Sequence, residues 1–172
     1  GIVNATDADA GHNGQILYSL EPLSPFTIDR SGRIVTSRSV DREVTSEYKL
    51  RVIAVDQALD DSRRLSSTAQ VVIRVLDIND NAPQFRYPNA SNNRLHLSYR
   101  EKPSFRVARV RALDRDAGRN AKLHYSIIKG NIYSLFHLDA QSGDLVLQND
   151  MSAAHMGTIV LRLKATDQGV PP

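Results

Sequence analysis

The sequence predicts an all-β fold in which two antiparallel β-sandwich repeats follow one another along the chain. Three observations support this prediction: the chain repeats itself, apolar and polar residues alternate within each copy, and an oxygen-rich segment ending in proline separates the copies. The length of 172 residues suits one or two domains. With 41% hydrophobic and 24% charged residues, the composition is that of an ordinary globular protein.

Internal duplication is the most informative of these observations. The pattern Ala-x-Asp-x-Asp-Ala-Gly-x-Asn occurs at 5–13 and again at 112–120, an offset of 107. Two further pairs of segments match in the same order: 26–29 with 136–139, and 50–57 with 161–168. The offset drifts only from 107 to 111, which indicates homologous units that differ by short loop insertions.

The predicted elements within each copy are short strands. Apolar and polar side chains alternate with a period of two in four segments: 48–55, 70–75, 122–127 and 159–165. Ser31-Gly32 and Ser142-Gly143 lie between short apolar runs, as hairpin turns do. No stretch sustains a helical period. Short strands in units of about 100 residues indicate an antiparallel sandwich.

The predicted boundary falls at residues 77–83, Asp-Ile-Asn-Asp-Asn-Ala-Pro. We expect a first repeat over 1–76, a linker over 77–83 and a second repeat over 84–172. Pro83 cannot donate a hydrogen bond to a central β-ladder. A flexible linker would be rich in Gly and Ser, whereas this one is dense in side-chain oxygens.

Several function classes are excluded or disfavoured. Without cysteine, the chain has no disulfide, thiolate zinc site, iron–sulfur cluster or cysteine nucleophile. We find no Gly-x-Ser-x-Gly, phosphate-binding glycine loop or His-Glu-x-x-His, and the five histidines have no ligand spacing, so we expect no enzyme. No apolar run approaches the roughly 20 residues of a spanning helix, and no signal peptide begins at Gly1, so any such segment lies outside this sequence.

Basic residues crowd positions 94–122, a pattern that nucleic-acid and heparin surfaces share. No aromatic residues interleave with them in a way that would stack bases, so we expect no nucleic-acid partner. We favour the interpretation that these residues alternate outward from strands and solvate a face.

The acidic residues that recur at fixed positions point to calcium, which takes six to eight oxygen ligands. An EF-hand is disfavoured because its twelfth position needs Glu, whereas counting from Asp7 or Asp114 gives Tyr18 or Tyr125. A single Asp-x-Asp-x-Gly would be interpreted as a turn. Two copies and an acidic linker favour a metal site instead.

These motifs together resemble those of cadherin extracellular repeats. The resemblance rests on Asp41-Arg42-Glu43, the linker, both Asp-x-Asp-x-Gly-x-Asn segments, Ala165-Thr166-Asp167 and Tyr99-Arg100-Glu101-Lys102-Pro103. It covers essentially the whole chain. It implies two tandem Greek-key antiparallel β-sandwich repeats joined by a calcium-binding linker.

The resemblance also implies three calcium ions at the junction. The implied ligands are Asp41, Glu43, Asp77, Ile78 (carbonyl), Asn79, Asp80, Asn81 (carbonyl), Asp114, Asp116, Asn120 (carbonyl) and Asp167. Asp80 and Asp116 resemble bridging ligands. Half-sites of neighbouring junctions are implied at Asp7, Asp9, Asn13, Asp56 and Glu101.

The sequence departs from the family pattern in four respects. The first repeat is expected to lack its N-terminal strand and the second its C-terminal strand. Asp41-Arg42-Glu43 maps onto Ser152-Ala153-Ala154, which predicts a calcium-poor, more flexible next junction. No proline-rich loop follows Asp56, and the absence of Trp disfavours a strand-swapping tip repeat.

The expected function is calcium-dependent cell–cell adhesion or recognition by a segment of an extracellular rod. The expected partner is another cadherin-like ectodomain, and the expected location is the ectodomain of a membrane-anchored protein. A non-adhesive spacer in a large signalling receptor, or a metal-independent sandwich binding module, remains an alternative. Two glycosylation sequons, at Asn4 and Asn89, favour the cell exterior weakly.

Overall fold

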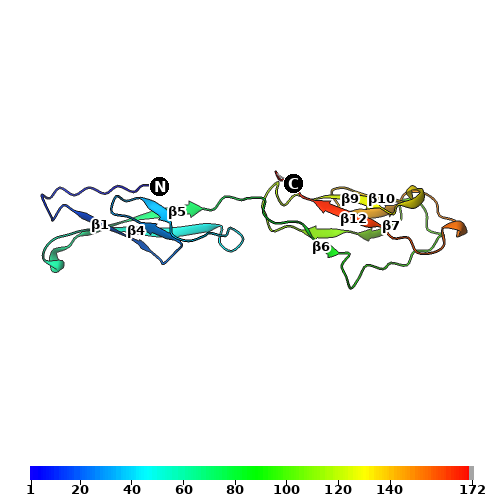
Figure 1. Cartoon of the computed structure of the whole chain (residues 1–172), viewed down its shortest axis with the longest axis horizontal. Helices are drawn as coiled ribbons and strands as arrows, with labels where there is room; N and C mark the ends of the chain where they lie inside the picture. Colours follow the sequence, from blue (N-terminus) through cyan, green and yellow to red (C-terminus); the bar gives the residue numbers. More distant parts are fainter. Residues whose placement is uncertain (171–172) are drawn as a thin grey trace. The chain divides into compact units, whose positions relative to one another are not determined.

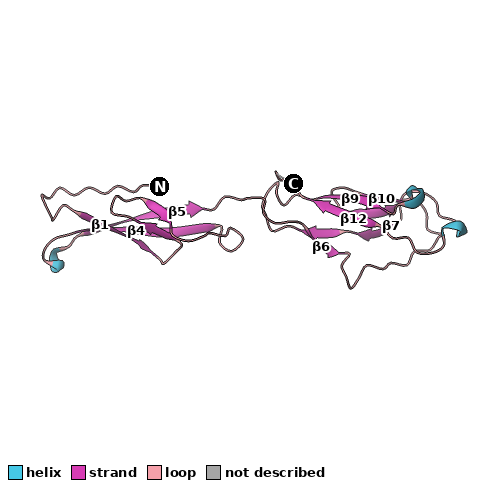
Figure 2. Ribbon diagram, viewed as in Figure 1, coloured by secondary structure: helices cyan, strands magenta, loops and turns pink. Residues whose placement is uncertain are grey.

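A computed structural model describes residues 1–170 and divides the chain into two compact units, Gly1–Leu76 and Asp77–Pro172. Within the described residues there are twelve β-strands, three 3₁₀ turns and no α-helix (Figure 2). Every strand pair is antiparallel. The predicted all-β, antiparallel fold is therefore confirmed.

The first unit is built around one long central strand. β4 (Glu47–Asp56) pairs with β1 (Ile16–Glu21) on one side and with β5 (Ser66–Arg74) on the other (Figure 1). Its residues alternate between the two faces, so Leu50 and Val52 are each only 2% exposed. The 3₁₀ turn η1 (Asp61–Arg63) lies in the connection from β4 to β5.

A hairpin of β2 (Phe26–Ile28) and β3 (Ile34–Thr36) completes the first core. Phe26 and Ile34 are buried in the cluster that contains Leu50 and Val52. In the turn, Gly32 adopts φ +76°, a conformation that favours glycine. The predicted turn is thus present where Ser31-Gly32 indicated.

The described residues of the second unit form three separate β-sheets. β6 (Gln84–Tyr87) pairs with β8 (Arg111–Leu113), and β9 (His124–Lys129) pairs with β12 (Arg162–Thr166). β11 (Asp144–Leu147) lies between β7 (Arg106–Arg109) and β10 (Phe136–Leu138). Two further 3₁₀ turns are η2 (Ile132–Ser134) and η3 (Ala153–His155). The core includes Leu147, Leu135 and Val110, which are 0%, 1% and 2% exposed.

A tyrosine hydroxyl marks the same place in both units. The N–H of Ala5 donates to the hydroxyl of Tyr18 at 2.8 Å, and the N–H of Ala112 donates to that of Tyr125 at 3.0 Å. Both pairs are related by the offset of 107 found in the sequence. The duplication is therefore structural as well as sequential.

One predicted strand is shorter than its pattern indicated. The alternation over 159–165 predicted a strand, but β12 begins at Arg162. Its partner Lys129 ends β9 and is followed by Gly130 at φ +88°. Ile159 and Leu161 still pack on the core, so the apolar alternation was predicted correctly, although these residues precede the hydrogen-bonded part of the strand.

Within residues 1–170, no helix is long and apolar enough to cross a membrane.

Candidate metal centre

Chain topology gathers the predicted ligands of the second unit at one pole. β6 and β8 are antiparallel with Gln84 opposite Leu113, so the linker that precedes β6 lies beside the loop that follows β8. That loop leads into β9, whose first residue His124 lies opposite Thr166 at the end of β12. The ends of these strands therefore bring 77–81, 114–120 and Asp167 together.

Asp77 joins the linker to the loop after β8. Both of its carboxylate oxygens accept the N–H of Ala117 at 3.1 Å, and Oδ2 also accepts Nδ2 of Asn120 at 2.8 Å. Asp77 and Asp116 offer carboxylate oxygens within 4.8 Å of one another. Two unit charges at that distance repel by about 3 kcal/mol at an effective dielectric constant of about 20.

Asn81 holds the other end of the linker against the same loop. Its N–H donates to Oδ2 of Asp116 at 3.2 Å, and its Nδ2 donates to Oδ1 of Asp116 at 2.7 Å. The same Nδ2 lies 2.8 Å from Oδ1 of Asp80. Asp116 is 7% exposed, so its charge is held in a largely dry position.

Asp167 closes the third side of the cluster. Its Oδ1 accepts Nδ2 of Asn79 at 3.1 Å and the N–H of Gly169 at 2.9 Å. Asp167 is 7% exposed. The linker is thus hydrogen-bonded to both the β8–β9 loop and the segment after β12.

Asp114 has the feature of this cluster that most favours cation binding. Its Oδ1 accepts the N–H of Asp116 at 3.0 Å, which forms the Asp-x-Asp turn. Its Oδ2 is buried and has no hydrogen-bond partner. A buried carboxylate oxygen without a partner carries a large desolvation cost, which a cation would offset. The residues present therefore fit a divalent cation.

The donor set selects among cations. Five carboxylates from Asp77, Asp80, Asp114, Asp116 and Asp167 gather with the amide groups of Asn79, Asn81 and Asn120. Hard oxygen ligands in this number suit calcium, whereas zinc favours nitrogen and sulfur donors. Ile78 is 71% exposed, and its carbonyl accepts the N–H of Asp80 at 3.0 Å.

Gly169 is a part of this cluster that the sequence interpretation missed. A Cβ at this position would lie 2.6 Å from Oδ1 of Asn120 and 2.6 Å from Cγ and Nδ2 of Asn79. The close approach of two side-chain amides therefore requires a residue without a side chain here. The only available signal was its place two residues after Asp167.

The first unit carries its predicted ligands at opposite ends of β4. Asp41 and Glu43 precede the strand, and the N–H of Glu43 donates to Oδ1 of Asp41 at 2.9 Å. Asp56 ends the strand, is 7% exposed, and accepts the N–H groups of Ala58 and Leu65 at 3.2 and 3.0 Å. The side chain of Glu43 lies 2.6 Å from Nη2 of Arg42.

The other Asp-x-Asp segment has the same local geometry as its counterpart. The N–H of Asp9 donates to Oδ1 of Asp7 at 2.8 Å, and Gly11 adopts φ +64° where Gly118 adopts φ +59°. Asp7, Asp9 and Asn13 are exposed. The turn therefore forms from its own sequence, whereas burial of its second-unit copy depends on the linker.

The segment that replaces Asp41-Arg42-Glu43 keeps the turn and loses the charge. The N–H of Ala154 donates to Oγ of Ser152 at 3.3 Å, the same i+2 contact that Glu43 makes to Asp41. The ring of His155 packs on Tyr133 with centroids 5.0 Å apart. Glu101 is half-buried, and its N–H donates to the carbonyl of Ser98 at 3.1 Å.

The two predicted glycosylation residues are both exposed. The structure records no side-chain hydrogen bond for Asn4 within the described residues. In contrast, Nδ2 of Asn89 donates to the carbonyl of Arg86 at 3.1 Å, and its Oδ1 accepts the N–H of Ser91 at 2.9 Å. Modification of Asn89 would have to release that amide nitrogen.

The antiparallel β units and the oxygen-rich linker define a tandem-repeat protein with a candidate divalent-cation centre. The chain belongs to the cadherin family: the profile described as "Cadherin domain" matches residues 1–76 and 95–172. The family resemblance is therefore confirmed. Cadherin repeats bind calcium and are not enzymes, in agreement with the expectations from the sequence.

Curated relatives and solved structures agree with this assignment. The chain is 46% identical to mouse "Cadherin EGF LAG seven-pass G-type receptor 2", matching over 99% of the chain and 6% of that protein. It is 37% identical to fruit fly (Drosophila melanogaster) "Protocadherin-like wing polarity protein stan", over 98% of the chain and 5% of that protein. The crystal structure of mouse cadherin-23 EC22-24 is similar with TM-score 0.86 and 36% identity, over 99% of this chain and 53% of that one.

Proposed function

We propose that the chain is a calcium-rigidified segment of an extracellular rod that serves calcium-dependent cell–cell adhesion or recognition. The main support is the buried Oδ2 of Asp114, which has no hydrogen-bond partner inside a cluster of five carboxylates. Structures of relatives add support, since one is titled "Crystal structure of the Protocadherin GammaB4 extracellular domain". That structure has TM-score 0.85 and 32% identity to this chain, and covers 96% of it.

The proposed ligands are those that the sequence indicated, with three calcium ions between the repeats. The first repeat contributes Asp41 and Glu43. The second contributes Asp77, Ile78, Asn79, Asp80, Asn81, Asp114, Asp116, Asn120 and Asp167. Asn81 and Asn120 are proposed to bind through carbonyl oxygens, as the family resemblance implies, while their Nδ2 groups donate to Asp116 and Asp77.

The mechanism that we propose is electrostatic. Seven carboxylates in one small volume repel strongly, and each pair about 5 Å apart contributes about 3 kcal/mol at an effective dielectric constant of about 20. Three divalent cations supply six positive charges, which nearly balance them. Each ion that binds the folded chain and not the unfolded chain then stabilises the fold by about 2.7 kcal/mol, at a calcium concentration about 100 times the Kd of its site.

The parent protein is proposed to be membrane-anchored, and the partner to be another cadherin-like ectodomain. A second candidate is a non-adhesive spacer in a receptor ectodomain. The relatives named as seven-pass G-type receptors favour it, although the chain spans only 6% of their length. Aggregation of beads coated with the ectodomain distinguishes adhesion from spacing. If this segment is only a spacer, beads coated with an ectodomain that lacks it should still aggregate, whereas loss of aggregation would indicate a direct role in adhesion.

Calorimetry on the chelator-stripped chain tests the calcium proposal. We expect heat on calcium addition and a rise in Tm of several degrees. Asp116→Asn should lose most of this response, whereas Asp150→Asn should retain it, since Asp150 is exposed and lies outside the cluster. A chain that shows no calcium heat and an unchanged Tm would be a metal-independent binding module instead.

A further inference from the structure

The solvent face of the β9–β12 ladder in the second unit carries cationic and uncharged side chains and no acidic ones. Lys164 and Arg162 point outward from β12, because the residues between and after them, Leu163 and Ala165, pack on the core. On β9 the same face carries His124 and Ser126, since Tyr125 and Ile127 are turned inward. Lys122 precedes β9 in the same alternation and is exposed.

No acidic side chain neutralises this face. Neither β9 nor β12 contains Asp or Glu. Lys122, Lys129, Arg162 and Lys164 form no ion pair with any residue in the part of the chain that the structure describes. Arg162 even has Lys129 as its cross-strand neighbour, and like charges directly opposite each other are destabilising.

Most acidic residues of the second unit are engaged elsewhere. Five of its nine acidic residues belong to the candidate metal centre. Asp144 lies 2.8 Å from Arg109 and 3.8 Å from Arg106, and Asp150 lies 3.8 Å from Lys102. The second unit has thirteen Lys and Arg residues, so its excess positive charge is left on other surfaces.

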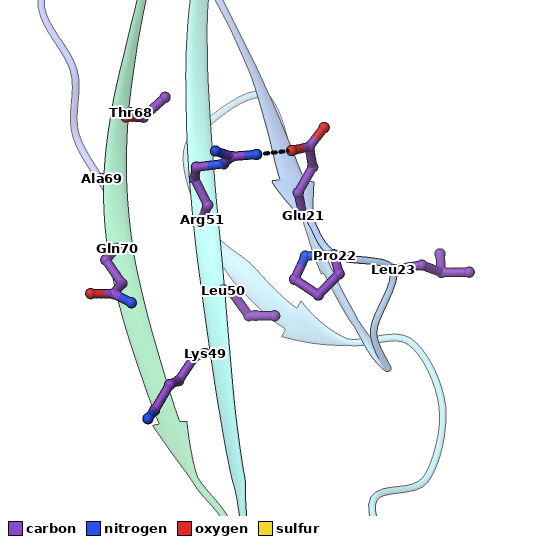
Figure 3. Close-up of a pocket in the computed structure, with 9 residues that line it drawn as sticks. All are labelled: Glu21, Pro22, Leu23, Lys49, Leu50, Arg51, Thr68, Ala69 and Gln70. Atoms are coloured by element: carbon purple, nitrogen blue, oxygen red, sulfur yellow. Dashed lines mark hydrogen bonds and ion pairs between the residues drawn. The ribbon is translucent and has the colours of Figure 1, made fainter.

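The first unit provides an internal comparison on the same scaffold. By the repeat offsets, Arg51 corresponds to Arg162, but Arg51 lies opposite Glu21 and forms an ion pair with it at 2.6 Å (Figure 3). Glu21 corresponds to Ile128, which removes that partner. The cationic face is therefore a property of the second repeat and not of the fold.

Three other positions change in the same direction. Gln15 corresponds to Lys122, Pro22 to Lys129, and Ile53 to Lys164. The second repeat thus gains three cations and loses one anion on this face. Successive outward residues on one strand are about 7 Å apart and adjacent strands about 5 Å apart, which spaces the charges along a ridge.

We infer that this face, defined by Lys122, Lys129, Arg162 and Lys164 around Ser126, binds a linear sulfated polysaccharide. Charge complementarity requires a polyanion. The face presents no Phe, Tyr or Trp on which bases would stack, which disfavours single-stranded nucleic acid. The choice of a sulfated glycan over other polyanions rests on the extracellular location proposed above. The assignment of the cationic face itself does not depend on that proposal.

Heparin affinity in calcium-containing buffer tests the inference on the whole chain. The variant Lys122→Gln/Arg162→Gln/Lys164→Gln should weaken heparin binding at least tenfold and reduce the slope of log affinity against log salt by roughly one per lost contact. The matched control Arg30→Gln/Arg33→Gln/Arg38→Gln removes three charges from exposed positions of the first unit and should bind as the wild type does. Ile128→Glu, which copies the first repeat, should also weaken binding.

Several results would overturn the inference. One is an equal loss of affinity in the two triple variants, and another is wild-type affinity in the β9–β12 variant with an unchanged Tm. Desulfated heparin, duplex DNA and anionic phospholipid vesicles serve as competing probes, and tighter binding to any of them than to heparin would also refute it. Repeating the assay with the calcium-deficient Asp116→Asn variant separates this inference from the calcium proposal, since heparin binding should persist there.

Discussion

Asn81 contacts both carboxylate oxygens of Asp116, through its backbone N–H at 3.2 Å and through its side-chain amide at 2.7 Å. One linker residue thereby fixes the orientation of a carboxylate that is 7% exposed. The orientation of Asp116 is consequently set before any cation arrives.

Substitution of Asn81 should therefore weaken cation binding without removing a side-chain ligand. Asn81→Ala frees Asp116 to rotate, and we expect calcium affinity to fall about tenfold, equivalent to about 1.4 kcal/mol. Calorimetric titration measures the change. Asn92→Ala is the control, because Asn92 lies outside the cluster and forms hydrogen bonds with Asn89. Unchanged affinity in Asn81→Ala would contradict the positioning role.

Gly169→Ala tests the close packing beside Asp167. The added Cβ would lie 2.6 Å from both Asn79 and Asn120, so at least one amide must move. We expect a loss of about 1–3 kcal/mol in the free energy of unfolding with calcium present, and weaker calcium binding. Urea denaturation measures the first effect. The neighbouring Val170→Ala, at an 88% exposed side chain, should change neither quantity.

The first-repeat ligands can be exchanged for their second-repeat counterparts. Asp41→Ser with Glu43→Ala copies Ser152 and Ala154, which keep the turn but not the carboxylates. We expect the number of bound calcium ions to fall while the fold persists. The reciprocal Ser152→Asp with Ala154→Glu should leave calcium binding to the linker unchanged, since these residues precede β12 and Asp167 follows it. An unchanged stoichiometry in Asp41→Ser/Glu43→Ala would exclude both residues as ligands.

Tyr125→Phe tests the hydrogen bond repeated in both units. The change leaves the buried N–H of Ala112 without its acceptor, and we expect a loss of about 1–3 kcal/mol in the free energy of unfolding. The matched Tyr18→Phe should cost less, because the N–H of Ala5 is only partly buried. Equal losses of unfolding free energy in urea denaturation would show that burial of the N–H group does not determine the cost of removing its acceptor.

Acid sensitivity should include a contribution from Asp139. The N–H of Ser142, its side chain and the N–H of Gln141 hold the pKa of this carboxyl below its ordinary value of 3.8. A lowered pKa stabilises the folded state above pH 3.8, and that stabilisation is lost as pH falls through the folded-state value. Asp139→Asn should therefore flatten the decline of Tm below pH 4, and a decline equal to that of wild type would contradict this assignment.

Much of the fold could be predicted because the information is local or repeated. The alternation of β4 and the turn at Gly32 follow from strand period and glycine conformation alone. The Asp-x-Asp turns also form from neighbouring residues. The prediction of a calcium-binding linker at residues 77–83 rests on a composition that differs from that of a flexible segment.

The remaining features depend on contacts between residues far apart in the chain. Asn79 and Asp167 are separated by 88 positions, so no local pattern indicates that the amide of one meets the carboxylate of the other. The requirement for glycine at 169 follows from that meeting and was missed. β12 starts at Arg162 because its partner β9 ends at Lys129. The end of β9 cannot be inferred from the residues of β12.

The ten residues of β4 separate Asp41 and Glu43 at one end from Asp56 at the other. Since an extended residue advances by about 3.3 Å, the nine steps from Glu47 to Asp56 place the two ends of this strand roughly 30 Å apart. Insertion of a single residue would turn Leu50 or Val52 out of the core. The length of β4 therefore fixes the interval between the two groups of predicted metal ligands, because a change of length would displace residues of the hydrophobic core.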